Sequence, residues 1–339
     1  MKAIRIHRHG DPEVLQIDEL PLPSPSENEV LIRIKSAALN HLDLWVRRGV
    51  PGVQLPLIMG SDGAGVIEDL GALTAENVKF KKGDNVFLVP FRSSLPFGAQ
   101  EQLSPSYKIL GEHLNGTQAE YVVAPVDFIM SKPDSLTWPE TAAFPLAFLT
   151  AYQMLTKKVQ LHKDQTILIW GASSGIGSAA IQIASLFKTR IIATAGTDEK
   201  ADLARQLGAD KVIMYRTENV VQMVKKYTDG QGVDVIFEHV GEKSWYDSLR
   251  SLKMGGKIVT CGATTGAQVR LDLRHLFIKH QQIIGSTMGN RKDLREVSEL
   301  INQKKLKPVL AKSFPYQNIR AAHQYLEEGR QFGKVIIQF

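Results

Sequence analysis

The sequence predicts an α/β protein built from two domains, a barrel-like β domain and a doubly wound domain with a parallel six-stranded sheet. The chain has 339 residues, more than one ordinary hydrophobic core accommodates. Short strand-like runs fill residues 1–125, whereas apolar runs alternate with helix-length spacers across residues 165–289. This change of pattern marks the change of domain.

The first domain is expected to contain short strands separated by turns. Its runs are rich in β-branched residues and are bounded by Gly, Pro and Asp, a spacing typical of barrels. The predicted strands lie in KAIRIHRHG (2–10), VLIRIKSAAL (30–39), GAGVIEDLG (63–71), GDNVFLV (83–89) and AEYVVAP (119–125). A polar, Pro-containing stretch from Pro90 to Gly116 is expected to form a long surface loop or lobe.

The second domain is expected to contain six parallel strands with helices between them. The predicted strands are TILIW (166–170), RIIATA (190–195), KVIMY (211–215), VDVIFE (233–238), GKIVTC (256–261) and QIIGST (282–287). Two helices and a strand follow, at 291–305, 318–328 and 333–339, and are expected to return to the first domain. The predicted domains are therefore 1–147 with 290–339, and 148–289.

Composition limits the possible functions. The chain carries 41 Lys and Arg against 35 Asp and Glu, with no long run of one sign, which suits an anionic cofactor and does not require nucleic acid. No signal peptide and no apolar stretch of about eighteen residues is evident, so we expect a cytoplasmic protein without a membrane partner. The single cysteine, Cys261, excludes internal disulfides and a zinc site built on several thiolates.

A glycine-rich turn after the first predicted strand of the second domain indicates a dinucleotide site. Gly171, Gly175 and Gly177 form G-x-x-x-G-x-G, while the register of the usual G-x-G-x-x-G falls on Ala172, Ser174 and Gly177. Small residues let backbone N–H groups approach a pyrophosphate at a helix N-terminus. The alternative is an ordinary strand-to-helix turn, which the six-strand context disfavours.

The end of the next strand favours NADP(H) over NAD(H). NAD-selective sites place Asp or Glu there to bind the ribose hydroxyls, but this chain has Ala195 and Gly196. Lys200 follows and could pair with a 2′-phosphate. It is equally consistent with a solvated lysine in the first turn of a helix, and Asp198 and Glu199 beside it weaken the prediction.

These features together resemble the medium-chain dehydrogenase/reductase superfamily and, within it, the zinc-independent quinone oxidoreductase branch. The segments that carry the resemblance span nearly the whole chain: LNHLDLWVRRG, GSDGAGVIEDLG, AAFPLAFLTAYQML, GASSGIG, GVDVIFEHVG and QFGKVII. The resemblance implies a GroES-like β-barrel catalytic domain into which a Rossmann domain is inserted.

The resemblance also implies that zinc is missing. Zinc members carry a Cys where this chain has Asn40, a His where it has Ser61 and usually a second Cys where it has Leu146, although Asp62 matches an acidic position. Catalytic zinc needs about three protein ligands. The lobe that binds a structural zinc through four cysteines in many relatives corresponds to residues 90–110, which contain no Cys. We expect no metal in either place.

Asn40 and Asp43 are the candidate catalytic residues. In quinone reductases an Asn occupies the vacated cysteine position near the nicotinamide, and Asn40 matches it. Asn40 and Asp43, three residues apart, also resemble a helix N-cap and capping box, so both interpretations stay open and can coexist. Trp45 stands where a zinc enzyme has its proton-relay His.

The cofactor contacts implied by the family and by the carboxyl ends of the strands fall in four groups. Thr150 is expected beside the nicotinamide, and Cys261 is interpreted as a buried strand-end residue rather than a nucleophile. The full set is Thr150; Ser173, Ser174, Gly175, Ile176 and Gly177 at the pyrophosphate; Thr197, Lys200 and Tyr215 around the adenosine phosphate; and His239, Val240, Cys261, Gly262, Ser286, Thr287, Met288 and Lys334.

The predicted function is an NADPH-dependent, zinc-independent reductase of quinones or other activated carbonyl or enone acceptors. Hydride would pass to a substrate in the cleft between domains, with hydrogen bonds stabilising the developing oxygen charge and solvent supplying the proton. An enoyl-thioester reductase of the same superfamily remains an alternative. So does a non-catalytic dinucleotide-binding or RNA-binding protein, although the chain has no aromatic-basic patch.

The sequence also bears on a competing family and on assembly. A short-chain dehydrogenase is disfavoured, because no Tyr-x-x-x-Lys follows GASSGIG.

If the sixth strand of the sheet, in QIIGSTMG, is a free edge, its pairing across a two-fold axis would make a homodimer.

Overall fold

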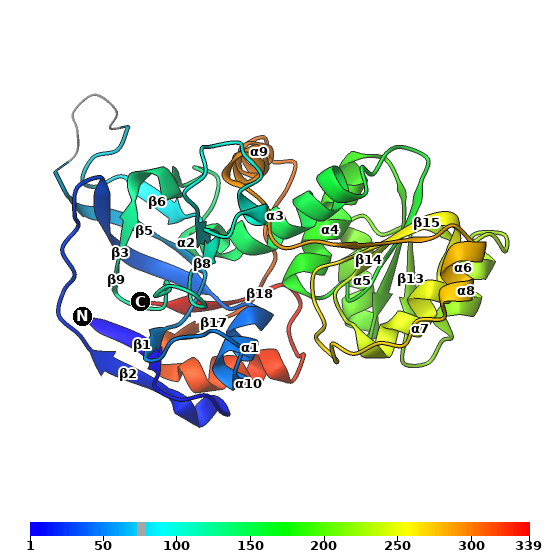
Figure 1. Ribbon diagram of the computed structural model, residues 1–339, viewed down its shortest axis with the longest axis horizontal. Helices are drawn as coiled ribbons and strands as arrows, with labels where there is room; N and C mark the ends of the chain where they lie inside the picture. Colours follow the sequence, from blue (N-terminus) through cyan, green and yellow to red (C-terminus); the bar gives the residue numbers. More distant parts are fainter. Residues whose placement is uncertain (73–78) are drawn as a thin grey trace. The chain divides into compact units, whose positions relative to one another are not determined.

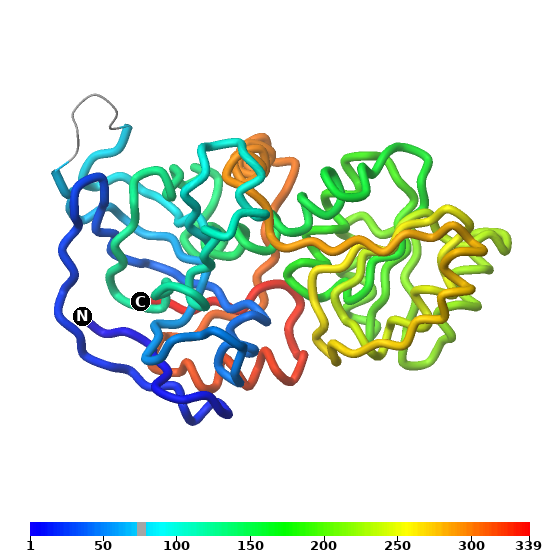
Figure 2. The backbone as a smooth tube through the Cα atoms, viewed as in Figure 1, coloured from blue at the N-terminus to red at the C-terminus, as the bar shows by residue number. Residues whose placement is uncertain are grey.

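The computed structural model describes residues 1–72 and 79–339, which divide into two compact units (Figures 1 and 2). The first unit comprises Met1–Ala147 and Asn290–Phe339, and the second comprises Phe148–Gly289. In the described part of the chain, every helix is too short or too polar to cross a lipid bilayer.

The first unit is built on a seven-stranded sheet with the strand order β10-β6-β5-β3-β18-β17, and β9 also pairs with β3. Its strands are β3 (Glu29–Ala38), β5 (Asp62–Leu70), β6 (Asn85–Leu88), β9 (Tyr121–Pro125), β10 (Ile129–Ser131), β17 (Leu310–Pro315) and β18 (Lys334–Gln338). A three-stranded sheet has the order β2-β1-β4, formed by β1 (Lys2–Ile6), β2 (Leu15–Glu19) and β4 (Leu57–Ile58). The last strand of the chain thus completes a sheet begun near its start (Figure 1).

Helices pack on these sheets and close two apolar cores. One core joins β1 and β18 to α1 and α10 through residues such as Ile4, Leu44 and Leu326, and the other includes Ile32 and Val86. Burying each such side chain stabilises the fold by about 1.5–3 kcal/mol. The helices of this unit are α1 (His41–Arg48), α2 (Trp138–Ala143), α9 (Arg291–Asn302) and α10 (Ile319–Glu327), with 3-10 turns at Pro12–Val14, Glu101–Leu103, Val126–Phe128 and Tyr316–Asn318.

The second unit is a parallel six-stranded sheet with the order β13-β12-β11-β14-β15-β16. Its strands are β11 (Thr166–Ile169), β12 (Arg190–Ala195), β13 (Lys211–Met214), β14 (Val233–Glu238), β15 (Leu252–Thr260) and β16 (Gln282–Gly285). The order reverses beside β11, because β12 lies on one side of it and β14 on the other. Ligands of such sheets bind at the carboxyl ends of the strands near this switch point.

Helices connect consecutive strands of this sheet. Val224 of α6 and Leu249 of α7 lie in one apolar cluster with Ile192, Ile236 and Ile258 of the sheet. The helices are α4 (Gly175–Leu186), α5 (Asp198–Gln206), α6 (Val220–Tyr227), α7 (Glu242–Ser251) and α8 (Leu273–Ile278); α3 (Pro145–Tyr152) spans the boundary between units and continues as a π-helical segment, Gln153–Lys158. The predicted combination of a β domain and a doubly wound six-stranded sheet is confirmed.

The stretch from Pro90 to Gly116, predicted as a long surface loop or lobe, contains regular structure. It contains two short paired strands, β7 (Phe91–Arg92) and β8 (Lys108–Ile109). Phe91 is fully buried, and its ring stacks on Tyr107 with the ring centroids 4.3 Å apart. The segment is therefore a folded lobe, and Phe91 also packs edge-on against Phe128 outside it.

Candidate active site and cofactor site

Asn40 lies between the end of β3 and the start of α1. Its backbone is extended, and its N–H donates to the carboxylate of Asp43 at 2.7 Å, which is one half of the predicted capping box. The Asn40 side-chain amide forms hydrogen bonds with Asp62 and Lys334 instead. The cap position and the use of the amide in a polar cluster therefore coexist in this residue.

Strand register brings Asn40 together with Asp62 and Lys334. Asp62 pairs with Ala38 across β3 and β5, and Ile336 pairs with Ala38 across β3 and β18. Continuing the second register places Lys334 level with Asn40. The Lys334 ammonium donates to the Asn40 Oδ1 and, at 3.0 Å, to Asp62 Oδ2, while Asn40 Nδ2 donates to the same Asp62 oxygen at 2.9 Å.

This cluster is almost completely removed from water. Asp62 is fully buried, and Lys334 and Asn40 are 5% and 9% exposed. Buried charges are costly unless they are paired and hydrogen-bonded. Asp62 meets this condition, because its other carboxylate oxygen accepts from the backbone N–H of Leu146 at 2.9 Å.

Asp43 is a second buried carboxyl group beside the cluster. Burial raises the pKa of Asp43 to about 7; the hydrogen bond from the Asn40 backbone and the positive charge of Lys334 oppose this rise, and the negative charge of Asp62 adds to it. Gln118 Nε2 lies 3.4 Å from the Asp43 carboxylate. The site thus contains a group that changes its ionisation near neutral pH.

The residues around Asn40 do not fit a zinc ion. Ser61 uses its hydroxyl to donate to the carbonyl of Leu110 at 2.7 Å, and Leu146 offers only a backbone N–H. Across residues 1–72 and 79–339, no group of three His, Cys, Asp or Glu side chains could hold a metal. The Lys334 ammonium already pairs with Asp62, whereas catalytic zinc needs about three protein ligands.

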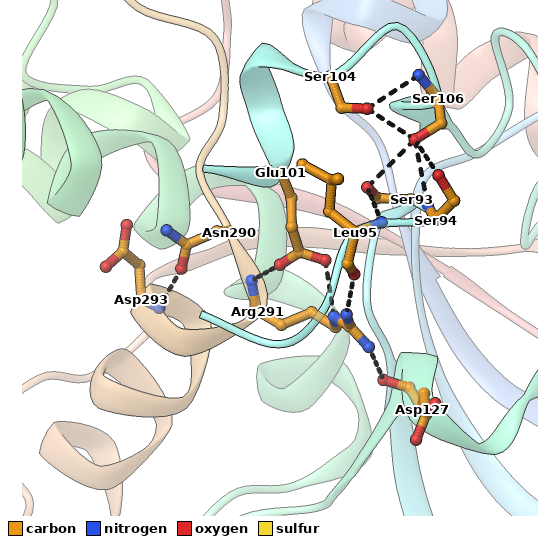
Figure 3. Close-up of polar contacts among 10 residues, drawn as sticks. All are labelled: Ser93, Ser94, Leu95, Glu101, Ser104, Ser106, Asp127, Asn290, Arg291 and Asp293. Atoms are coloured by element: carbon orange, nitrogen blue, oxygen red, sulfur yellow. Dashed lines mark hydrogen bonds and ion pairs between the residues drawn. The ribbon is translucent and has the colours of Figure 1, made fainter. Parts of the chain in front are cut away.

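The lobe at residues 90–116 is held by a second buried cation, Arg291, at the start of α9 (Figure 3). Its backbone N–H and Nε donate to the two carboxylate oxygens of Glu101 at 2.8 and 2.7 Å. Its terminal nitrogens donate to the carbonyls of Leu95 at 2.8 Å and Asp127 at 3.4 Å. The guanidinium also lies 4.4 Å from the centre of the Phe128 ring.

The glycine-rich turn lies between β11 and α4 and has the shape of a phosphate cradle. Gly171 has φ +62°, and the Ser174 hydroxyl caps α4 by accepting from the Gly177 N–H at 2.8 Å. A Cβ at Gly177 would overlap the carbonyl oxygen of Gly171. The first turn of α4, which contains Gly175 and Ile176, presents N–H groups that suit a pyrophosphate.

Two cations lie near the end of β12, where an NAD-selective site would have an acid. Burial lowers the pKa of Lys200, and the positive charge of Arg216 adds to this shift. A Cβ at Gly196 would meet the Tyr215 hydroxyl at 2.7 Å and Arg216 Nε at 3.2 Å. Thr197 caps α5. The sequence prediction omitted Arg216, although it adjoins Tyr215 and follows the strand that pairs with β12.

A cavity of about 400 Å³ lies at the carboxyl ends of β14, β15 and β16. Its lining contains four of the predicted cofactor residues, Cys261, Gly262, Ser286 and Thr287, together with Trp245. Ser286 Oγ and Trp245 Nε1 are buried without a hydrogen-bond partner in the described structure. A bound ligand could supply the missing partners. These features fit a dinucleotide.

Cys261 and His239 are both uncharged at neutral pH in this site. Burial and the negative charge of Glu238 raise the pKa of Cys261 to about 12, so the thiol stays protonated. Burial lowers the pKa of His239, and its Nε2 lies 2.9 Å from the Trp170 carbonyl. His239 therefore lies beside the glycine-rich turn as a neutral ring, within 3.1 Å of a Cβ built at Gly171.

The remaining predicted cofactor residues are spread over both units. Thr150 is buried in α3, Met288 follows β16 with φ +43°, and Ser173 and Val240 lie in the turns after β11 and β14. Lys334 belongs to the first unit, where its ammonium contacts the candidate catalytic residue Asn40. The structure thus places Lys334 with the residues predicted for catalysis.

Two family models match the chain: "Alcohol dehydrogenase GroES-like domain" over residues 26–134 and "Zinc-binding dehydrogenase" over residues 175–303. Crotonyl-CoA carboxylase/reductase of Cereibacter sphaeroides is 31% identical over 95% of this chain and 83% of its own length. Quinone oxidoreductase of Homo sapiens is 28% identical over 99% of this chain and 97% of its own length.

Solved structures agree with these matches. A structure described as an NAD-dependent alcohol dehydrogenase is 39% identical, covers both chains completely and has a TM-score of 0.95. A 2-octenoyl-CoA carboxylase reductase in complex with NADP and 2-octenoyl-CoA is 26% identical, with a TM-score of 0.89 over 99% of this chain and 87% of that chain. The chain belongs to the medium-chain dehydrogenase/reductase superfamily of oxidoreductases, as the sequence predicted.

Proposed function

We propose that this protein is an NADPH-dependent, zinc-independent reductase of quinones or other activated carbonyl or enone acceptors. The observation that carries the proposal is the buried cluster of Asn40, Asp62 and Lys334. It offers an amide donor and a fixed positive charge, which can stabilise a developing oxyanion without a metal. The human quinone oxidoreductase among the relatives supports the acceptor class.

The second unit would hold the cofactor. The first turn of α4 suits the pyrophosphate, and Lys200 with Arg216 suits a 2′-phosphate, because two cations close together favour a dianion between them. Similarity to the NADP-bound 2-octenoyl-CoA carboxylase reductase supports this choice, whereas similarity to the NAD-dependent alcohol dehydrogenase favours NAD. NADPH supplies a hydride when it is bound.

The chain's own contribution to the reaction is charge stabilisation. A quinone or enone that accepts a hydride gains two electrons, and the negative charge collects on its oxygen. Asn40 donates a hydrogen bond to that oxygen, and solvent supplies the one proton that completes the reduction. A saturated alcohol lacks such a charge sink, so the same donors would accelerate its oxidation far less.

An enoyl-thioester reductase is the second candidate. The crotonyl-CoA carboxylase/reductase of C. sphaeroides and the structure that holds 2-octenoyl-CoA favour it. The same cluster could stabilise the enolate that forms when a hydride adds to an unsaturated thioester. Turnover of crotonyl-CoA that exceeds turnover of every quinone and enone tested would select this alternative.

The first test compares oxidation of NADPH and NADH by the purified protein with quinones, enones and crotonyl-CoA, with zinc measured on the same sample. We expect NADPH-preferring reduction of a quinone or enone by protein with substoichiometric zinc. Stoichiometric zinc, or cofactor binding without reduction of any acceptor, would contradict the proposal. The second result would favour a non-catalytic role, and a steep salt dependence of RNA affinity would then support RNA binding.

Cofactor choice has its own test in the variant Lys200→Ala/Arg216→Ala. Loss of charged hydrogen bonds should weaken NADPH binding by roughly tenfold per cation and leave NADH binding unchanged. Cofactor fluorescence titration measures both affinities, and Lys226→Ala, an exposed lysine on α6, is the matched control. An equal loss for both cofactors would remove the case for a 2′-phosphate site.

The free edge of the sheet supports a homodimer. Among the described strands β16 pairs only with β15, so its outer edge lacks a partner. Apolar side chains of α8, which precedes β16 in the chain, are exposed, Phe277 by 63% and Ile278 by 61%. Pairing of two β16 strands across a two-fold axis would cover such an edge.

Light scattering on Phe277→Glu tests the dimer. We expect a dimeric mass for the unaltered protein and a shift toward one chain for the variant, because a charge would be forced into the apolar contact. Leu103→Glu, which changes an equally exposed leucine in the first unit, should keep the dimeric mass. A monomeric unaltered protein would refute the dimer.

A further inference from the structure

The Lys334 ammonium uses two of its three protons in hydrogen bonds within the described structure. Its Nζ donates to Asn40 Oδ1 and Asp62 Oδ2, and in the part of the chain that the structure describes no acceptor is present for the third proton. The side chain is 5% exposed, so bulk water does not screen its charge. The ammonium is therefore a strong, fixed source of positive potential at the Asn40 amide.

The contacts fix the Asn40 amide in one orientation. Its oxygen faces the ammonium and its nitrogen donates to the Asp62 carboxylate. A flipped amide would place NH₂ against the ammonium and the oxygen against the carboxylate, which is repulsive at both ends. One Nδ2 proton is used by Asp62, and the other has no acceptor among residues 1–72 and 79–339.

The Lys334 contact makes the second amide proton a better donor, whereas the Asp62 carboxylate on the first amide proton acts in the opposite direction. A cation at the amide oxygen draws electron density away from the nitrogen, and hydrogen bonds in such a chain strengthen one another. The effect grows as negative charge develops on a bound oxygen, because the cation, the amide dipole and the oxyanion then lie in series. Such an interaction is stronger in the transition state than in the ground state and raises kcat.

We propose that Lys334 is the built-in cation of the acceptor site: it orients and polarises the Asn40 amide, which donates its remaining proton to the acceptor oxygen. Lys334 is then a positioning residue that acts through Asn40, and Asp62 neutralises the buried ammonium. This inference rests on the proposed reductase function. The Lys334 ammonium would then supply the positive charge that a zinc ion supplies in zinc-dependent members of the superfamily.

The experiment is a set of variants measured for kcat and KM with NADPH and a quinone, for NADPH affinity by fluorescence, and for thermal stability. The set comprises Asn40→Ala, Lys334→Met, Asn40→Ala/Lys334→Met and Asp62→Asn/Lys334→Met. The last variant removes both charges, so it keeps the protein folded if the single Lys334→Met is unstable. Lys305→Met, an exposed lysine in the same unit, is the matched control.

We expect Lys334→Met and the neutral double variant each to lose on the order of 10²-fold in kcat, the lower end for removal of one oxyanion donor. KM and NADPH affinity should stay within about twofold, and the neutral double variant should recover thermal stability without recovering kcat. In the Asn40→Ala background, Lys334→Met should cost less than about threefold, because Lys334 acts through the missing amide.

Other results would overturn the inference. A neutral double variant with unaltered kcat would make the ion pair purely structural. NADPH binding weakened tenfold or more by Lys334→Met, with kcat retained, would make Lys334 a cofactor contact instead. Losses in kcat that multiply in Asn40→Ala/Lys334→Met would separate the two residues. If the unaltered protein binds NADPH but reduces no acceptor, the proposed function fails and the inference falls with it.

Discussion

Lys334 with Asp62 forms one buried cation–carboxylate pair of the first unit, and Arg291 with Glu101 forms another. Both occur where the family resemblance leads one to look for zinc, the first at the catalytic position and the second at the lobe. They differ in what else the cation binds. The terminal nitrogens of Arg291 donate to the backbone carbonyls of Leu95 and Asp127, whereas the Lys334 ammonium donates to the side-chain amide of Asn40.

The groups that surround a buried ion pair, rather than its burial alone, therefore indicate its role. Contacts to backbone carbonyls fix chain segments in place, so the Arg291 pair joins the lobe to α9 (Figure 3). A contact to a neutral side-chain amide orders a group that still has a proton to donate, so the Lys334 pair prepares a donor. A buried pair alone is weak evidence for stability.

The largest expected effect is on the stability of the lobe. Arg291→Met leaves Glu101 as an unpaired buried charge, which should lower the free energy of unfolding by about 3–5 kcal/mol. Chemical unfolding of the purified variant measures this loss, and Lys292→Met, an exposed neighbour on α9, should show almost none. Loss of kcat in folded Arg291→Met comparable with that in Lys334→Met would abolish the distinction between the pairs.

Removing both charges of the Arg291–Glu101 pair separates its effect on stability from its effect on the reaction. Glu101→Gln/Arg291→Met should recover most of the roughly 3–5 kcal/mol lost in Arg291→Met, because no uncompensated charge remains. Its kcat should equal that of the unaltered protein, unlike Asp62→Asn/Lys334→Met, which should be stable and slow. Thermal melts and steady-state rates on the two double variants decide the point. Equal rates for both would show that neither pair takes part in the reaction.

A pH effect, small over each step of a titration, applies to the Lys334 cluster and not to the Arg291 pair. Burial raises the pKa of Asp43 to about 7 from an unfolded value of about 3.9. Between these values the folded protein holds the proton more tightly, so this contribution to stability is lost as pH rises through the window. The slope is about 1.4 kcal/mol per pH unit.

The variant Asp43→Asn isolates this contribution. Its stability relative to the unaltered protein should rise from about pH 4 to about pH 7 and then level off, since the variant has no proton to lose. Unfolding midpoints across that range measure the difference, and Glu13→Gln, on the exposed surface, is the control. A difference that does not change with pH would mean that Asp43 is ionised throughout.

Local patterns predicted the features that depend on local sequence. The six sheet strands are runs of Ile and Val bounded by Gly or Asp, and the phosphate turn needs Gly at 171 and 177 for reasons of close approach. The hydrogen bond between Asn40 and Asp43 follows from their spacing. Short strands such as LQIDE at 15–19 were not predicted, because two apolar residues among three polar ones are too few to indicate a strand.

The long-range contacts could not be predicted from one sequence. Asn40 and Lys334 are 294 residues apart, and Glu101 and Arg291 are 190 residues apart. The first contact depends on the register between β3 and β18, which a shift of one residue would destroy. The sequence prediction named Lys334 as a cofactor contact and did not anticipate its hydrogen bond to Asn40, because a family match gives a position and not its neighbours.

If a cation of the protein supports reduction in place of zinc, NADPH-dependent quinone reduction should not depend on metal. The experiment measures its rate before and after exhaustive chelation, with zinc measured in both samples. We expect the same rate in both samples and substoichiometric zinc throughout, because Lys334 supplies the positive charge at Asn40. A rate that falls with chelation and returns when zinc is added would contradict the account.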